Sequence, residues 1–245
     1  MREISSVSVV IPAYNEEENI RTLLVETVAA LKSINVGFEI ILVDDGSEDN
    51  TFSIMKEFAH ETEKIVGIRH MRRRGKSMAL QSGFARAKGE AVVTMDADLQ
   101  YDPWEISRLL NLLDKGFDVV NGYRDFSKYV LGKTILSRFY NELSRRLLGS
   151  REVHDLNCGL KAFRKEVIKQ LLAKFVWRRG VHRYLINFCT ALGYKVTEVR
   201  VSLKPRSYGR SKYGWKRILE GVSVLFILFI KIRLLNFKNQ VLFRT

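Results

Sequence analysis

Residues 91–100 have the sequence Ala-Val-Val-Thr-Met-Asp-Ala-Asp-Leu-Gln, in which a short apolar run ends at two carboxylates. The run 91–95 is apolar and rich in β-branched residues, which predicts a buried strand. Asp96 and Asp98 follow it one residue apart, and Gln100 comes two residues later. Oxygen ligands of this kind suit a hard cation such as Mg²⁺ or Mn²⁺. The stretch therefore predicts a strand whose carboxyl end holds a metal, with room for a diphosphate against it.

The same alternation of short apolar runs and helical patterns extends on both sides of this stretch. Strands are expected at residues 7–11, 38–43, 65–69, 91–95 and 117–121. Helices are expected at residues 16–32, 49–63, 76–88 and 103–115. This repeated order favours an α/β fold, Rossmann-like, with a mostly parallel sheet and helices on both faces.

The pattern changes after residue 121. Helices are expected at residues 133–148, 167–174, 181–192 and 215–235, with a strand at 195–203. Because no repeat or linker interrupts the chain, we expect one domain over residues 1–213 and a C-terminal amphipathic segment over residues 214–245. That segment has apolar residues at helical spacing between basic ones, which is typical of a membrane-interfacial helix and also of a helix packed on its own domain.

Composition narrows the class of protein. The 245 residues are 46% hydrophobic and carry a net charge of +14, so a folded domain with anionic partners is expected. No nucleic-acid-binding motif accompanies the basic residues, so we expect no nucleic acid as partner. The two cysteines lack metal-ligand spacing. No signal peptide is seen, and the longest apolar run, 222–230, is shorter than the roughly 20 residues of a membrane span.

Polar groups follow three of the predicted strands, at residues 12–16, 44–47 and 96–100. Because the carboxyl ends of parallel strands share one edge, these groups should converge on a crevice. There Asp45 would accept a hydrogen bond from the N–H of a base, and Tyr14 would lie against that base. A solvated loop would explain one acidic pair, but three polar strand ends in this order favour a nucleotide site.

These motifs resemble those of the family-2 glycosyltransferases with the glycosyltransferase-A fold. The similarity is carried by PAYNEEENI (12–20), VDDGSEDNT (43–51), GKSMALQSGFARAKGE (75–90) and MDADLQYDP (95–103). A second set resembles dolichol-phosphate mannose synthases and bacterial polyprenyl-phosphate glycosyltransferases: NGYR (121–124), SRFYN (137–141), DLNCGLKAFRKEV (155–167) and PRSYGRSKYG (205–214). The first set implies transfer from a nucleotide sugar, and the second implies a polyprenyl-phosphate acceptor.

The resemblance also implies roles for individual residues. The residues implied to line the nucleotide pocket are Pro12, Tyr14, Glu16, Val43, Asp45, Lys76, Asp96 and Ala97. Those implied to hold the Mg²⁺ or Mn²⁺ ion are Asp96, Asp98 and Gln100. Those implied to act in catalysis are Asp98 and the phosphate-contacting Arg124, Arg138, Arg206 and Lys212. An exposed lysine at a helix start explains Lys76 equally well.

The implied activity is a metal-dependent, inverting transfer of a hexose to dolichyl or undecaprenyl phosphate. Mannose from GDP-mannose is the first guess, and glucose from UDP-glucose is the second. The acceptor lipid lies in a bilayer, so the enzyme is expected to be peripheral, at the cytoplasmic face of a membrane, reached directly or through an anchoring partner protein.

The chemistry of the acceptor distinguishes the alternatives. A lipid phosphate is already ionised near neutral pH and can attack without a general base, whereas a hydroxyl usually needs one. Asp155 is the one candidate base, and it would serve a soluble family-2 transferase that acts on a carbohydrate hydroxyl. A non-catalytic nucleotide-sugar-binding subunit is the alternative from another class. His154 and His182 are expected to be structural, and Arg72–Arg74 to form a solvated turn.

Overall fold

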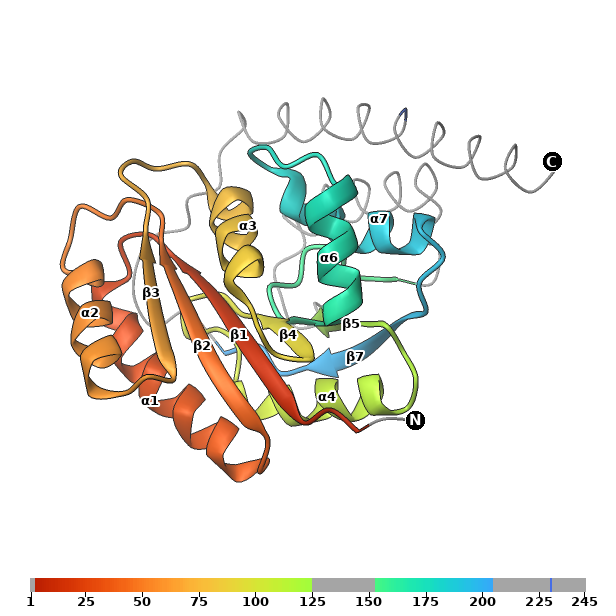
Figure 1. Cartoon of the computed structure of the whole chain (residues 1–245), viewed down its shortest axis with the longest axis horizontal. Coiled ribbons are helices and arrows are strands. Elements are labelled where there is room, and N and C mark those ends of the chain that lie inside the picture. The colour runs from red at the N-terminus through yellow and green to blue at the C-terminus, as the bar shows by residue number, and fades with distance from the viewer. Residues whose placement is uncertain (1–2, 125–152, 205–229, 231–245) are drawn as a thin grey trace, which may run out of the picture.

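The computed structural model describes residues 3–124, 153–204 and 230, and these residues form a seven-stranded mixed sheet between helices (Figure 1). The strands are β1 (Ser6–Ala13), β2 (Gly37–Asp44), β3 (Ile65–Arg69), β4 (Ala91–Thr94), β5 (Val119–Arg124), β6 (Lys161–Arg164) and β7 (Val196–Val201). Their spatial order is β3-β2-β1-β4-β6-β5-β7. Strand β6 is antiparallel to both of its neighbours, while the other pairs are parallel.

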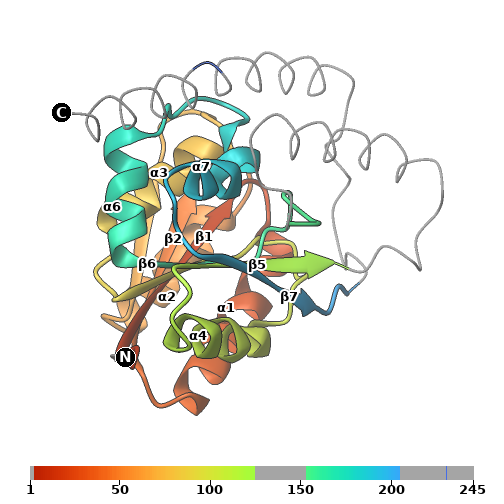
Figure 2. The same ribbon diagram turned by 90° about the vertical axis from the view of Figure 1, so that its right-hand side faces the viewer.

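Helices cover both faces of the sheet. They are α1 (Glu17–Ser33), α2 (Thr51–Glu61), α3 (Lys76–Arg86), α4 (Ile106–Asp114), α6 (Lys165–Lys174) and α7 (Leu185–Ala191), with the short 3-10 helices η1 (Pro103–Glu105) and η3 (Val181–Tyr184). In Figure 2, α3, α6 and α7 lie above the sheet, and α1 and α4 lie below it. Helix α2 packs on the same side as α1.

Successive side chains along each strand point to opposite faces of the sheet, so the strands contribute to a hydrophobic core on each face. Val9 and Ile11 of β1 pack under α1 and α4, whereas Val10 packs on the opposite face beside α3. Because each face is covered, the inner strands are apolar at nearly every position instead of at every second one. The predicted α/β sheet with helices on both faces is confirmed.

The register of the sheet brings the ends of β1, β2 and β4 to one edge. Ala13 pairs with Asp44 across β1 and β2, and Val10 pairs with Thr94 across β1 and β4. Antiparallel β6 starts at this same edge, because its first residue, Lys161, lies opposite Thr94 on one side and Asn121 on the other. The segment that precedes β6 is thereby inserted between the loops that follow β4 and β5.

Three details differ from the sequence prediction, the first being that the helix expected at 103–115 is divided into η1 and α4. Strand β6 was not expected, because its four residues are too few to show the alternation of apolar and polar side chains that marks a strand. A helix also begins directly after them, at Lys165. The helix expected at residues 181–192 is divided, since Val181–Tyr184 is a 3-10 turn and α7 begins at Leu185. The helices expected at 133–148 and 215–235, and the C-terminal segment 214–245, lie outside the described residues except for residue 230. Within the described residues, no helix combines the length and apolarity needed to cross a bilayer.

Candidate functional site

The loops after β1 and β2 are joined by hydrogen bonds at the carboxyl-end edge. Asn15, in the left-handed region at φ 52°, donates its backbone N–H to Ser47 Oγ at 3.0 Å. Its side-chain Oδ1 accepts the N–H of Glu48, also at 3.0 Å. The N–H of Glu16 donates to Thr51 Oγ1 at 2.8 Å. The two loops therefore form one wall, as the pattern of polar strand ends predicted.

Asp45 is buried in this wall and organises a third loop. Its Oδ1 accepts the backbone N–H of Arg74 at 2.9 Å and lies 2.9 Å from His70 Nδ1, while its Oδ2 accepts the N–H of Gly75 at 2.6 Å. The loop is held so close that a Cβ on Gly46, which has φ +74°, would lie 2.7 Å from the Arg72 carbonyl carbon. Asp45 thus holds the loop after β3 against the loop after β2, and its contact with a base stays a prediction.

Four more of the residues expected around the nucleotide, Pro12, Tyr14, Glu16 and Val43, lie along the same wall. Pro12 and Val43 are partners across β1 and β2. The ring of Tyr14 is half-buried, with the Arg73 guanidinium carbon 4.0 Å from its centre. Glu16 accepts the Asn19 side-chain amide at 2.8 Å.

The acidic loop after β4 presents its carboxylates in different surroundings. Leu99 has φ 57°, a left-handed turn between Asp98 and Gln100. Asp98 is buried, and its Oδ1 accepts the Gln100 N–H at 3.3 Å. The Asp96 side chain is 28% exposed and forms an ion pair with Lys76 Nζ, so the lysine at the start of α3 belongs to this loop. A positive charge therefore already lies at the carboxylate where a metal is expected.

The donor atoms of this loop suit a hard divalent cation. Asp96, Asp98 and Gln100 offer oxygen atoms only, and no cluster of three or more His, Cys, Asp or Glu side chains is found in the described part of the chain. Mg²⁺ binds well to such partial sites, because it keeps several waters and takes the remaining ligands from substrate phosphates. The residues present fit a metal that is shared with a diphosphate.

A support for Asp96 lies in the segment before β6, and the sequence interpretation did not identify it. A Cβ placed on Gly159 would lie 2.5 Å from Asp96 Oδ2, so a larger residue there would push this carboxylate aside. Gly159 is fixed by its N–H, which donates to the Tyr101 hydroxyl at 2.8 Å, and by its carbonyl, which accepts from Thr94 Oγ1 at 2.9 Å. Burial raises the pKa of Tyr101, so its hydroxyl stays protonated.

We predict that Gly159→Ala weakens binding of Mn²⁺ by about 10- to 100-fold, which is the usual effect of disturbing the support of a metal ligand. The new methyl group would displace the Asp96 carboxylate. Titration calorimetry with MnCl₂ and a nucleoside diphosphate measures the effect. Gly67→Ala is the control, since a Cβ there would meet nothing within 4 Å. Equal affinity in both variants would show that Asp96 does not depend on Gly159.

Arg124 at the end of β5 is held by Asp155. Its Nε donates to Asp155 Oδ2 at 2.6 Å, and a terminal nitrogen donates to Oδ1 at 2.9 Å. The Asp155 side chain is only 2% exposed. Burial by itself would lower the pKa of Arg124, but the hydrogen bonds and charge of Asp155 raise it overall, so the guanidinium stays charged. Both carboxylate oxygens of Asp155 are engaged, which does not suit the role of a general base.

A buried polar network holds Asp155 in place. The backbone N–H of Asp155 donates to Glu198 Oε1 at 3.1 Å, and its carbonyl accepts from Asn121 Nδ2 at 2.8 Å. Lys161 Nζ donates to Asn121 Oδ1 at 2.5 Å and to the Leu156 carbonyl at 3.2 Å. Burial lowers the pKa of the Lys161 ammonium to about 8. Sequence patterns could not reveal this network, because its members come together only when β5, β6 and β7 pair.

The lowered pKa of Lys161 predicts a pH-dependent stability. Folding releases the proton of Lys161 above about pH 8, whereas the unfolded chain holds it to about 10.5. Its contribution to the free energy of unfolding should therefore rise between these pH values, by up to roughly 3 kcal/mol. Urea unfolding at pH 7.5 and 10 measures the difference in free energy of unfolding between wild type and Lys161→Met, and this difference should change with pH. Exposed Lys115→Met should give none, and a constant difference for Lys161→Met would contradict the prediction.

The remaining predicted site residues, Arg138, Arg206 and Lys212, lie outside the described residues. Both histidines that were expected to be structural have hydrogen-bond partners. His154 Nδ1 lies 2.9 Å from Glu198 Oε2, and His182 Nδ1 lies 2.9 Å from Ser77 Oγ.

Comparison with known proteins adds a family, two curated relatives and two solved structures. The model of the family "Glycosyl transferase family 2" matches residues 8–172. Undecaprenyl-phosphate 4-deoxy-4-formamido-L-arabinose transferases from Pectobacterium atrosepticum and Edwardsiella ictaluri are 35% and 36% identical over 218 and 219 residues. These alignments cover 89% of this chain and 65% and 66% of the relatives, so the chain spans about two thirds of their length.

The solved structures are of glucosyl-3-phosphoglycerate synthase from Mycobacterium tuberculosis. The complex with Mn²⁺ and UDP-glucose superimposes with a TM-score of 0.69 at 21% identity and covers 90% of this chain and 79% of that chain. The complex with phosphoglyceric acid gives a TM-score of 0.68 at 23% identity, with the same coverage. At this identity the likeness establishes the fold.

Proposed function

Because this chain belongs to glycosyl transferase family 2, we propose that it binds a nucleotide sugar through a divalent cation and transfers the sugar to undecaprenyl phosphate or a similar polyprenyl phosphate. The observation that carries the proposal is the placement of an all-oxygen acidic loop and a carboxylate-supported arginine at one edge of the sheet. The loop is Asp96–Gln100, and the arginine is Arg124.

A UDP-linked sugar is a better candidate donor than GDP-mannose. The curated relatives are named for transfer of a formamido-arabinose, and the Mycobacterium structure holds UDP-glucose. Neither name includes mannose or a guanine nucleotide. The wall made by Pro12, Tyr14, Val43 and Asp45 would then face uracil.

Positive charge at the leaving group is the first task of this site. Asp96, Asp98 and Gln100 would hold Mg²⁺ or Mn²⁺, which when bound neutralises charge that develops on the departing diphosphate. Lys76 contacts the same Asp96 carboxylate, so it brings a second positive charge to that end of the crevice. In the transfer, an acceptor phosphate oxygen forms a bond to the anomeric carbon while the bond to the diphosphate oxygen breaks, and the electron pair leaves with the diphosphate.

Positioning the acceptor is the second task. Arg124 is fixed by Asp155 and would hold a phosphate oxygen, with Arg138, Arg206 and Lys212 completing the set. Because a phosphate needs no deprotonation near neutral pH, the reaction proceeds without a general base. This fits the engagement of Asp155 by Arg124 and favours a phosphate acceptor over a carbohydrate hydroxyl. A single displacement inverts the anomeric configuration.

A donor panel tests the proposal. The whole chain would be incubated with Mn²⁺ or Mg²⁺, undecaprenyl phosphate and labelled UDP-glucose, UDP-4-deoxy-4-formamido-L-arabinose, UDP-GlcNAc or GDP-mannose. We expect label to enter the organic phase from a UDP-sugar. Transfer from GDP-mannose alone would overturn the donor assignment. Donor binding without transfer, in membranes as well as in detergent, would instead favour a non-catalytic binding subunit.

A further inference from the structure

Two basic loops lie side by side at the same edge of the molecule as the candidate site. The first, Met71–Gly75, joins β3 to α3, and the second, Trp177–Gly180, joins α6 to η3. They touch where the Arg179 side chain passes Gly75, since a Cβ on that glycine would lie 3.1 Å from Arg179 Cγ. Ser77 Oγ, just behind them, accepts the His182 N–H at 3.1 Å and so ties α3 to η3.

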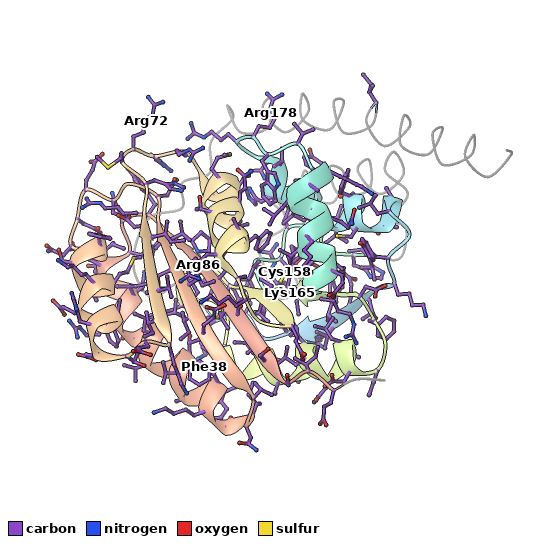
Figure 3. All side chains as sticks on the ribbon, in the orientation of Figure 1. Phe38, Arg72, Arg86, Cys158, Lys165 and Arg178 are labelled. Atoms are coloured by element: carbon purple, nitrogen blue, oxygen red, sulfur yellow. The ribbon has the colours of Figure 1, made fainter. Side chains whose placement is uncertain are left out.

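Positive charge dominates this pair of loops, and the local sequence supplies no acid to balance it. The exposed arginines are Arg72, Arg73, Arg74, Arg178 and Arg179. Neither residues 70–89 nor residues 167–197 contain an Asp or Glu. Figure 3 shows the side chains of Arg72 and Arg178 pointing away from the sheet at the same end of the molecule.

Two carboxylates beside the first loop are already engaged. Asp45 is buried and accepts the backbone N–H groups of Arg74 and Gly75, and Asp96 pairs with Lys76. Arg73 lies over the ring of Tyr14 and serves the crevice. Within the described residues, Arg72, Arg178 and Arg179 are exposed and form no ion pair with a carboxylate, so they can meet an anionic partner.

An apolar side chain at the tip of the first loop points to the kind of partner. Met71 is 98% exposed, the highest value among the large exposed hydrophobic residues of the described chain, and it stands next to Arg72. Trp177, in contrast, packs inward on Phe84 and Phe175, so it anchors the second loop. A flexible apolar tip among arginines suits the headgroup layer of a bilayer, where apolar groups insert and cations meet anionic lipids.

We infer that the loops Met71–Gly75 and Trp177–Gly180 dock the catalytic domain on an anionic membrane surface. Their position at the carboxyl-end edge would turn the candidate site toward the bilayer. This orientation rests on the proposed function, because it matters for an acceptor that is a membrane lipid. Docking itself needs neither donor nor acceptor, so it can be tested separately. A nucleic-acid surface is less suitable, since Trp177, the aromatic residue of these loops, packs its ring on Phe84 and Phe175 instead of presenting it for stacking on bases.

Vesicle sedimentation with the whole chain tests the inference. Binding to phosphatidylcholine vesicles that contain about 30% phosphatidylglycerol is compared with binding to pure phosphatidylcholine vesicles. Each arginine removed should lower the partition coefficient roughly fivefold, so Arg72→Gln with Arg178→Gln should lower it about 25-fold. The matched control is Lys32→Gln with Lys115→Gln, which removes the same charge from exposed positions before β2 and β5.

A Met71→Ser variant and a comparison with duplex DNA complete the binding test. Met71→Ser should weaken binding to anionic vesicles but leave binding to duplex DNA unchanged. An equal loss from the loop variant and the control variant would show that net charge alone acts and would overturn the inference, as would unchanged binding of the loop variant. Tighter binding to DNA than to anionic vesicles would assign the loops to nucleic acid instead. The variant Arg72→Gln with Arg178→Gln should still transfer sugar to the acceptor in detergent. If wild type also shows no transfer in detergent, that result would count against the proposed function and not against docking.

Discussion

Replacing Asp98 by alanine should lower turnover by about 10³-fold or more, equivalent to roughly 4 kcal/mol of transition-state stabilisation. The buried Asp98 carboxylate belongs to the acidic loop that we propose holds a cation against the diphosphate, so the substitution removes a proposed metal ligand. Donor binding should also lose its dependence on Mn²⁺. Steady-state transfer and calorimetric titration of the UDP-sugar, each with and without Mn²⁺, measure the two effects.

Asp102→Asn is the matched control for this prediction. Asp102 lies four residues beyond Asp98, and its carboxylate accepts the Trp104 N–H at 3.2 Å as a cap of η1. That variant should keep its metal dependence, most of its activity and nearly all of its stability, because asparagine caps a helix about as well as aspartate. An Asp98→Ala protein with normal turnover would refute the metal assignment.

Asp155→Asn is expected to have the second largest effect. We predict a fall in kcat of about 100-fold at every pH, because Arg124 loses the carboxylate that orients it and a misplaced group can weaken catalysis by that factor. The free energy of unfolding should fall by about 3–5 kcal/mol, since a charge buried against Asp155 is left unpaired. The pH profile of kcat and urea unfolding provide the readouts.

A double-mutant cycle distinguishes a positioning role from a catalytic base. If Asp155 acts through Arg124, the variant Arg124→Gln with Asp155→Asn should be no slower than Arg124→Gln alone. A general base would behave differently. Its loss would remove the ionisation seen on the acidic side of the pH profile, and its effect would add to that of Arg124→Gln, which would favour a hydroxyl acceptor.

Much of the fold follows from local pattern. Residues 7–121 alternate β-branched runs with amphipathic helices, and each run is short enough to be a strand and apolar enough to be buried on both faces. Because the carboxyl ends of parallel strands lie at one edge of a sheet, the loops of Asp45 and Asp98 could be predicted to share that edge. The family predicted from the quoted motifs is likewise confirmed, because the model of glycosyl transferase family 2 matches residues 8–172.

The rest depends on long-range pairing that local pattern does not encode. Strand β6 has four residues, and it is recognisable only through its partners β4 and β5. The pairing of Asp155 with Arg124, and of Gly159 with Asp96, follows from this insertion. Sequence alone does not decide whether Lys76 is an exposed lysine or a site residue. Its position at the start of a helix does not reveal that Asp96, twenty residues later, lies beside it.

The identity of the sugar could not be read from the residues for a related reason. The roles predicted for residues of the wall concern the nucleotide, and no residue was assigned to the sugar ring. Arg138, Arg206 and Lys212, which were predicted to contact phosphates, lie outside the described residues. The first guess of mannose accordingly gives way to a UDP-sugar proposal, with the acceptor class unchanged.

A direct comparison of two lipids measures the central claim, that the acceptor is a phosphate. The enzyme, Mn²⁺ and its preferred labelled donor are incubated with undecaprenyl phosphate or with undecaprenol, which differ only in the phosphate group. We predict a labelled, acid-labile lipid product from the phosphate and none from the alcohol. Equal or faster transfer to undecaprenol would contradict the claim, because it would require a base that deprotonates a hydroxyl.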